Sequence, residues 1–130
     1  MVTKKKKEVT VTENLLSEAR VQQNCVIWYK NGFCLATHPA RCLILAIPNE
    51  NQPLLVAIGL YPGASDMLVI HRNTPKERAR VAFIEAKDDI GTQKPKQKKF
   101  QAHVEGMGFE YHIIRTLKDF QKIVESWKNQ

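Results

Sequence analysis

The sequence predicts a single α/β domain in which a mixed β-sheet is packed by helices, in the order α-β-β-β-α-β-α. Two observations favour this class. The chain has 130 residues, of which 43% are hydrophobic and 25% charged, as in one globular domain. Short apolar runs of strand length also alternate with segments whose apolar residues recur at helical spacing. No apolar run reaches about 18 residues, so no membrane span is expected.

The first predicted element is a helix over residues 13–30. Thr10 and Glu13 have the spacing of a capping box at its start. The Asn-Gly pair that follows residue 30 is expected to end it. Two strands are expected next, at 33–37 and 41–48.

The middle of the chain combines an irregular segment with a hairpin. Residues 48–65 contain three prolines and two glycines and are expected to be irregular, with a helical turn near 53–59. Residues 66–71 and 79–87 are apolar runs joined by a polar connection. They are expected to form a β-hairpin.

The last third predicts helix, strand and helix. A helix is expected to begin near Pro95 and to end at Gly108, and a strand follows at 109–114. Thr116 and Asp119 have the spacing of a second capping box. The apolar stripe of that helix consists of Leu117, Phe120, Ile123, Val124 and Trp127.

The net charge is +7, which favours a polyanionic partner, most often nucleic acid. The alternative is simple solubility. Residues 1–9 are predicted to be a basic tail, and residues 10–130 a single domain. The N-terminus lacks the apolar segment of a signal peptide. The expected location is therefore inside a cell.

The three cysteines are odd in number and include no C-x-x-C pair, which argues against a disulfide framework. Cys34, His38 and Cys42 are spaced four residues apart and could hold zinc. That interpretation would make the chain a zinc-stabilised structural protein. We favour the alternative that the cysteines are small buried hydrophobes.

Acidic residues are predicted to meet at one edge of the hairpin. Glu85 and Lys87 lie two residues apart on one strand, so their side chains point to the same face. Asp66 opens the preceding strand, and in a hairpin the start of one strand lies beside the end of the other. Adjacent carboxylates repel and raise each other's pKa. Mg²⁺ or Mn²⁺ would remove this conflict.

Lys87 could orient or deprotonate a metal-bound water, which is what attack on a phosphodiester requires. The alternative is a solvated Glu–Lys pair at a strand end, since an E-x-K triplet is short enough to occur by chance. Gln97, at the start of the helix from Pro95, could hydrogen-bond a phosphate or the attacking water. As a lone residue it is more often a polar group at a helix start.

Glu18 falls within the apolar stripe of the first predicted helix. An acid that faces a core is rare without a partner. A third carboxylate near the metal, acting directly or through water, would explain it. The alternatives are a buried salt bridge or a helical wheel misjudged by one residue.

Four lysines follow the acids and could neutralise phosphates without reading bases. The alternative is a solvated helix face. They are Lys94, Lys96, Lys98 and Lys99.

Together, "GLYPGASDMLVI", "FIEAKDD" and "KPKQKKFQAHVEGMGFEYHII" resemble the VRR-NUC domain, the virus-type replication-repair nuclease branch of the PD-(D/E)XK superfamily. The resemblance covers residues 13–125. One departure is Ser65, where the family more often has proline. The matched positions are Pro62-Gly63, Asp66, Glu85-Ala86-Lys87, Gln97, Phe100 and Gly108, with the opening-helix acid at Glu18.

The resemblance implies a restriction-endonuclease-like core and Mg²⁺- or Mn²⁺-dependent phosphodiester hydrolysis, without a small-molecule cofactor. Asp66, Glu85 and the main-chain carbonyl of Ala86 would hold metal. Lys87 would activate or position water, with Gln97 and Glu18 in support.

Stand-alone family members, found in phages and bacteria, tend to be homodimers that act on branched DNA. The resemblance thus implies the cytoplasm of a bacterial or phage-infected cell as the location. The expected function is therefore a structure-selective endonuclease on Holliday-junction-like or flap DNA. Leu16 and Ile27 are candidates for the dimer surface. The alternative is a non-catalytic nucleic-acid-binding module that has kept the nuclease fold.

Overall fold

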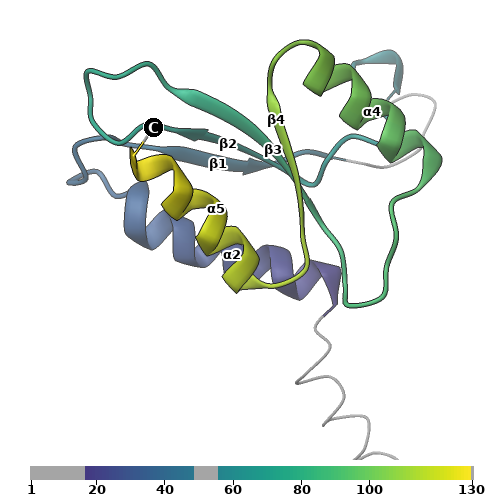
Figure 1. Cartoon of the computed structure of the whole chain (residues 1–130), viewed down its shortest axis with the longest axis horizontal. Helices are drawn as coiled ribbons and strands as arrows, with labels where there is room; N and C mark the ends of the chain where they lie inside the picture. Colours follow the sequence, from purple (N-terminus) through teal and green to yellow (C-terminus); the bar gives the residue numbers. More distant parts are fainter. Residues whose placement is uncertain (1–16, 49–55, 130) are drawn as a thin grey trace, which may run out of the picture.

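The computed structural model describes residues 17–48 and 56–129, which form a four-stranded sheet with helices against both faces (Figure 1). The order of the elements is the predicted one. They are α2 (Glu18–Phe33), β1 (Leu43–Ala46), β2 (Met67–His71), β3 (Arg80–Ala86), α4 (Pro95–Gly106), β4 (Glu110–Ile114), α5 (Leu117–Ser126) and the short 3₁₀-helix η1 (Trp127–Asn129).

The sheet is mixed, as predicted. Its strand order is β1-β2-β3-β4, with β1, β2 and β3 antiparallel in succession and β4 parallel to β3. The parallel pair needs a crossover connection, and α4 supplies it. Met67 pairs with Ile84 and Glu85 pairs with Ile113, so the end of β3 lies between the start of β2 and the end of β4.

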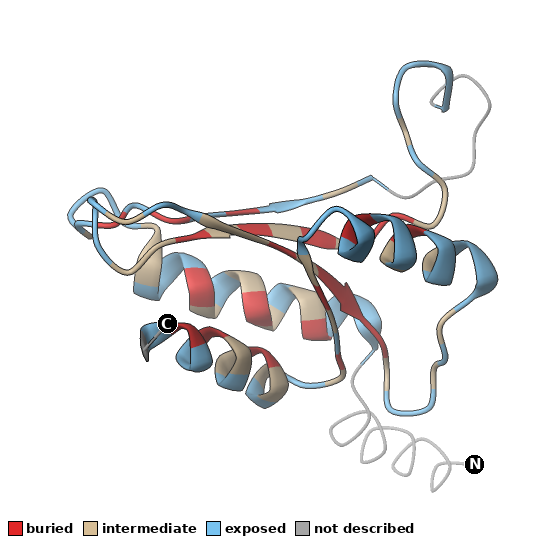
Figure 2. Ribbon diagram, turned by 45° about the horizontal axis from the view of Figure 1, so that its top comes forward, coloured by how far each residue is buried: buried red, intermediate tan, exposed pale blue. Residues whose placement is uncertain are grey.

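The main core lies between the sheet and the pair α2 and α5, whose buried residues face the strands (Figure 2). On α2 the buried residues are Val21, Cys25 and Tyr29, at the four-residue spacing of one helix face. A smaller cluster lies under α4 on the opposite side. It consists of Ala64, Phe100, Val104 and Tyr111. Helix α4 is thus packed separately from the other two helices.

Helix α2 differs from its prediction at both ends. Ser17 caps its start by accepting a hydrogen bond from the backbone N–H of Arg20. The predicted capping box of Thr10 and Glu13 lies outside the described residues. At the other end the helix continues through the Asn-Gly pair to Phe33, so the predicted stop was wrong.

The strand predicted at 33–37 was also wrong, because Phe33 ends the helix and turns follow it. The Phe33 ring stacks on Tyr29 at a centroid distance of 5.0 Å and meets His71 edge-on at 5.2 Å. Packing of this ring on the core carries the helix past a glycine that would otherwise weaken it.

The remaining predicted elements are confirmed within a few residues. The predicted strand 41–48 forms β1, and the predicted hairpin forms β2 and β3. Both hydrogen bonds of the capping box between Thr116 and Asp119 are present at the start of α5. In the predicted turn at 53–59, Val56 and Ala57 are helical, and residues 53–55 lie outside the described part.

All three cysteines are free thiols, and Cys25 and Cys42 are buried. The Cys42 thiol donates to the carbonyl of Arg72 at 3.3 Å. Across residues 17–48 and 56–129, no three His, Cys, Asp or Glu side chains gather closely enough to hold a metal ion between them. No helix in these two ranges is long and apolar enough to cross a membrane.

Candidate active site

The predicted acids meet where β2 begins and β3 ends. Asp66 directly precedes β2, and the antiparallel register places it opposite Glu85. Asp66 Oδ2 accepts a hydrogen bond from the backbone N–H of Ala86 at 2.7 Å. The two carboxyl groups are also close enough to hydrogen-bond each other. Hairpin geometry therefore fixes the pair, as the sequence predicts.

Gln97 joins Glu85 to Lys87. Its Nε2 donates to Glu85 Oε2 at 2.9 Å, and its Oε1 accepts from Lys87 Nζ at 2.9 Å. Lys87 Nζ also lies 3.5 Å from Glu85 Oε2. Glu85 and Lys87 are only 1% and 3% exposed. The first turn of α4 is thus bound to the end of β3 through one amide side chain.

The carboxylates resist ionisation in the absence of another cation. Burial, and then the charge of Asp66, raise the pKa of Glu85 to about 7, and the positive charge of Lys87 acts against this rise. Burial also raises the pKa of Asp66, while the hydrogen bond from the Ala86 N–H opposes it. The single charge of buried Lys87 does not balance two ionised carboxylates. Additional positive charge would therefore stabilise their ionised forms.

Glu18 is placed differently from its prediction. It is the first residue of α2 and is exposed, not directed into the core. It shares the helix face of Val21 and Cys25, but one turn before the core begins. Its charge still raises the pKa of both Asp66 and Glu85. The expectation of a core-facing acid was wrong. The Glu18 carboxylate nevertheless lies near enough to the Asp66 and Glu85 carboxylates to raise their pKa values.

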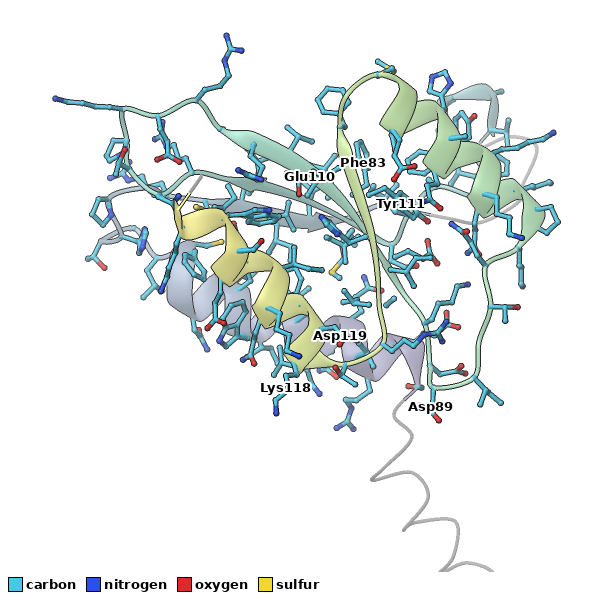
Figure 3. The ribbon with its side chains drawn as sticks, viewed as in Figure 1. Phe83, Asp89, Glu110, Tyr111, Lys118 and Asp119 are labelled. Carbon is cyan, nitrogen blue, oxygen red and sulfur yellow. The ribbon has the colours of Figure 1, made fainter. Side chains whose placement is uncertain are left out.

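Tyr111 is a neighbour of Glu85 that the sequence did not single out. Figure 3 shows it on the side of β4 that faces α4. Its hydroxyl is 3.5 Å from Glu85 Oε1 and accepts from Gln93 Nε2 at 3.2 Å. The pairing of Phe83 with Tyr111 puts this ring on the same sheet face as Glu85. The sequence alone could not indicate this neighbour, because it depends on the parallel register between β3 and β4.

The four predicted lysines surround Gln97 on the first turns of α4. All are exposed, and none contributes to the core. They lie at the positive end of the helix dipole, which favours anions. They are Lys94, Lys96, Lys98 and Lys99.

Gly63 lets the turn before Asp66 pack closely against α4. Its φ is +90°, and a Cβ at this position would lie 2.5 Å from the carbonyl oxygen of Lys96. A side chain would therefore push the first turn of α4, and Gln97 with it, away from the acids.

Gly63→Ala is expected to destabilise the fold by about 2–4 kcal/mol, since it combines an unfavourable φ with a backbone clash. Gly108→Ala is the matched control. Gly108 has a φ of +91°, but no atom lies within 4 Å of an added Cβ. Its substitution therefore carries only the cost of the unfavourable φ, without a clash. Denaturant unfolding of both variants measures the difference. Equal losses would show that the close approach to Lys96 is unimportant.

Comparison with known proteins identifies the fold. No protein-family profile matches the sequence, and no curated protein matches it either. A solved structure described as a VRR_NUC domain protein superposes with a TM-score of 0.66 at 16% identity, covering 88% of this chain and 90% of that one. The chain has the VRR-NUC fold. At this identity the likeness establishes the fold alone.

The donors in this VRR-NUC fold suit a hard divalent cation. Asp66 and Glu85 supply carboxylate oxygens, and the main chain at Ala86 lies beside them. The described part of the chain contains no three-residue ligand cluster. Mg²⁺, however, is usually bound through one or two carboxylates and keeps several waters. Because burial raises the pKa of both acids, added positive charge here would favour their ionised forms.

Proposed function

We propose that the chain is a metal-dependent DNA endonuclease that hydrolyses phosphodiester bonds with Mg²⁺ or Mn²⁺. One observation carries the proposal: a half-buried and a buried carboxylate lie together beside a buried lysine whose ammonium group is held by Gln97. A buried Lys–Glu pair with an extra acid is a costly arrangement for a structural role alone. The description of the structural neighbour as a VRR_NUC domain protein supports the same chemistry.

In this proposal Asp66, Glu85 and the Ala86 carbonyl would hold the cation. A bound cation supplies Lewis-acid stabilisation of charge on the scissile phosphate. The Ala86 N–H fixes the orientation of Asp66. Glu18, which is exposed at the start of α2, would act through water.

Lys87 would position the attacking water and the phosphate. Its Nζ has three hydrogens, of which one is held by Gln97 Oε1. Its burial keeps the ammonium group in a single place, because the 3% of its surface that is exposed leaves little room for other rotamers. Gln97 therefore aligns the lysine with the carboxylates before substrate arrives.

The substrate we propose is branched DNA, such as a Holliday-like junction or a flap, cut by a homodimer. The lysines of α4 would contact phosphates, which positions DNA without reading its sequence. Selectivity would then come from the spacing of two sites on bent or branched DNA. Of the two dimer-surface candidates, Ile27 is 51% exposed on α2, and Leu16 lies outside the described residues.

The function is tested by incubating the purified protein with labelled duplex, nicked, flap and four-way DNA, each with Mg²⁺, Mn²⁺ or EDTA. Cleavage of a branched substrate that requires the metal is the expected result. Binding of every substrate without cleavage under any condition would instead favour the non-catalytic nucleic-acid-binding module.

The double substitution Lys96→Ala and Lys99→Ala is expected to weaken binding to all DNA sequences about equally. Each lost phosphate contact should reduce the slope of log Kd against log salt by roughly 0.9. Fluorescence anisotropy at several salt concentrations measures the slope. Lys122→Ala with Lys128→Ala, which removes two lysines from α5 and η1, is the matched control. An unchanged slope in the α4 variant would place the DNA elsewhere.

A further inference from the structure

Arg115 binds the loop that leaves the candidate site. It directly follows β4, and its Nη1 donates to the carbonyl oxygens of Asp88 and Gly91, each at 2.7 Å. The same nitrogen lies 3.5 Å from the carbonyl oxygen of Asp89. Figure 3 shows Asp89 at the outer end of this loop. One side chain thus contacts three carbonyls within four residues.

The loop is irregular, and hydrogen bonds hold its two ends: the Lys87 N–H donates to the Ile114 carbonyl, and Gln93 and Lys94 donate to neighbouring side chains. No helix or strand forms between Ala86 and Pro95, so its backbone groups need partners from elsewhere. Inside the loop, Asp88 Oδ1 accepts from the N–H groups of Ile90 and Gly91. This bond pattern makes a compact turn. Arg115 then ties the turn to the end of β4.

The turn passes near the side chains of Lys87 and Glu18, which are proposed to act on DNA. A Cβ built at Gly91 would lie 3.5 Å from Lys87 Cδ and 3.4 Å from Glu18 Oε2. The main chain at Gly91 therefore passes close to the stem of Lys87 and to the carboxylate of Glu18, within about one methyl group of contact. Movement of the turn would free both side chains on that side.

We propose that Arg115 is a positioning residue, which holds the 88–91 turn against Lys87 so that its ammonium group stays on Gln97 and Glu85 while DNA is cut. This role rests on the proposed nuclease function. The strand register explains why Lys87 and Arg115 lie near each other. Ala86 pairs with Ile114, so Lys87 and Arg115 leave adjacent parallel strands at the same sheet edge.

A direct phosphate contact is the competing role for Arg115. The two roles differ in what they change. A phosphate contact contributes to DNA affinity and to its salt dependence, whereas a positioning residue affects the rate of the bound complex. Two of its donor hydrogens already point to loop carbonyls, which favours positioning.

The test compares Arg115→Ala with Arg72→Ala. Arg72 is a matched control, because its guanidinium also donates to loop carbonyls, those of Ala40 and Pro75, away from the acids. Single-turnover cleavage, DNA affinity at two salt concentrations and hydrogen exchange of segment 88–94 are measured for each.

Arg115→Ala is expected to lower the single-turnover rate by about 10- to 100-fold, with Kd and its salt slope unchanged and with faster exchange in 88–94. Arg115→Lys should restore part of the rate, because an ammonium group can donate to two carbonyls. Arg72→Ala should keep the wild-type rate.

Gly91→Ala keeps the test open should Arg115→Ala not fold. Its Cβ would lie 2.7 Å from Asp88 Oδ1, so it disturbs the same turn without changing charge. A slower rate at unchanged Kd supports the proposal. A wild-type rate in either turn variant, or a loss confined to Kd with a smaller salt slope, overturns it. If the wild-type protein cleaves no DNA, the nuclease function itself is rejected. Results on the variants alone bear only on the role of Arg115.

Discussion

Lys87→Ala and Asp66→Asn are each expected to lower DNA cleavage by about 10³-fold or more while DNA binding survives. Asp66→Asn keeps the shape of the side chain but removes the negative charge that would hold the cation. Lys87→Ala removes the ammonium group that Gln97 Oε1 and Glu85 Oε2 keep in place. Neither residue is among the exposed lysines of α4, so affinity for phosphates should change little.

Single-turnover cleavage with Mn²⁺ and anisotropy with the same DNA separate the two effects. Lys128→Ala and Glu125→Gln are the controls, since both residues are exposed near the C-terminus, away from the acids. Circular dichroism verifies that each variant is folded. Wild-type cleavage by both purified site variants would reject the assignment of Asp66 and Lys87.

The metal-free protein is expected to lose stability at the site as pH rises from about 4.5 to 7. In the unfolded chain Glu85 releases its proton near its ordinary pKa of 4.5, and in the native state near 7. Between these values the unfolded state binds fewer protons, so the free energy of unfolding falls with pH. The raised pKa of Asp66 acts in the same direction. The loss is on the order of 3 kcal/mol for Glu85.

Glu85→Gln is expected to remove most of this decline. His71 gives the opposite slope, because burial lowers its pKa and the unfolded state then binds more protons. The informative quantity is therefore the difference between wild type and Glu85→Gln, measured by denaturant unfolding in EDTA at pH 5 and pH 8. Curves that run parallel across this range would contradict the raised pKa of Glu85.

The parts of the site that the sequence predicts are those set by local geometry. A hairpin places the start of its first strand beside the end of its second strand, so the sequence predicts that Asp66 lies beside Glu85. A proline in the first turn likewise located the helix start at Pro95, and a capping box located the one at Leu117. In these segments local preference and tertiary packing agree.

Prediction from the sequence failed where tertiary contacts determine the end of a helix or the neighbours of the site. Packing of the half-buried Phe33 ring against the core extends α2 through a glycine that ordinarily signals a helix end. Glu18 fits the helical wheel, but the wheel does not show where along the helix the core begins. Tyr111 and Arg115 reach the site only through the pairing of β4 with β3. A parallel register between strands separated by a helix has no local signature.

The thermal midpoint in increasing Mn²⁺, measured at pH 8 for wild type and for Asp66→Asn, tests most directly whether Asp66 and Glu85 hold a divalent cation. A ligand that binds only the native state stabilises it by about 2.7 kcal/mol at one hundred times its Kd. A rise of several degrees for wild type that is absent in Asp66→Asn is the predicted result. A wild-type midpoint that ignores Mn²⁺, or an equal rise in both proteins, would contradict a metal site at these two carboxylates.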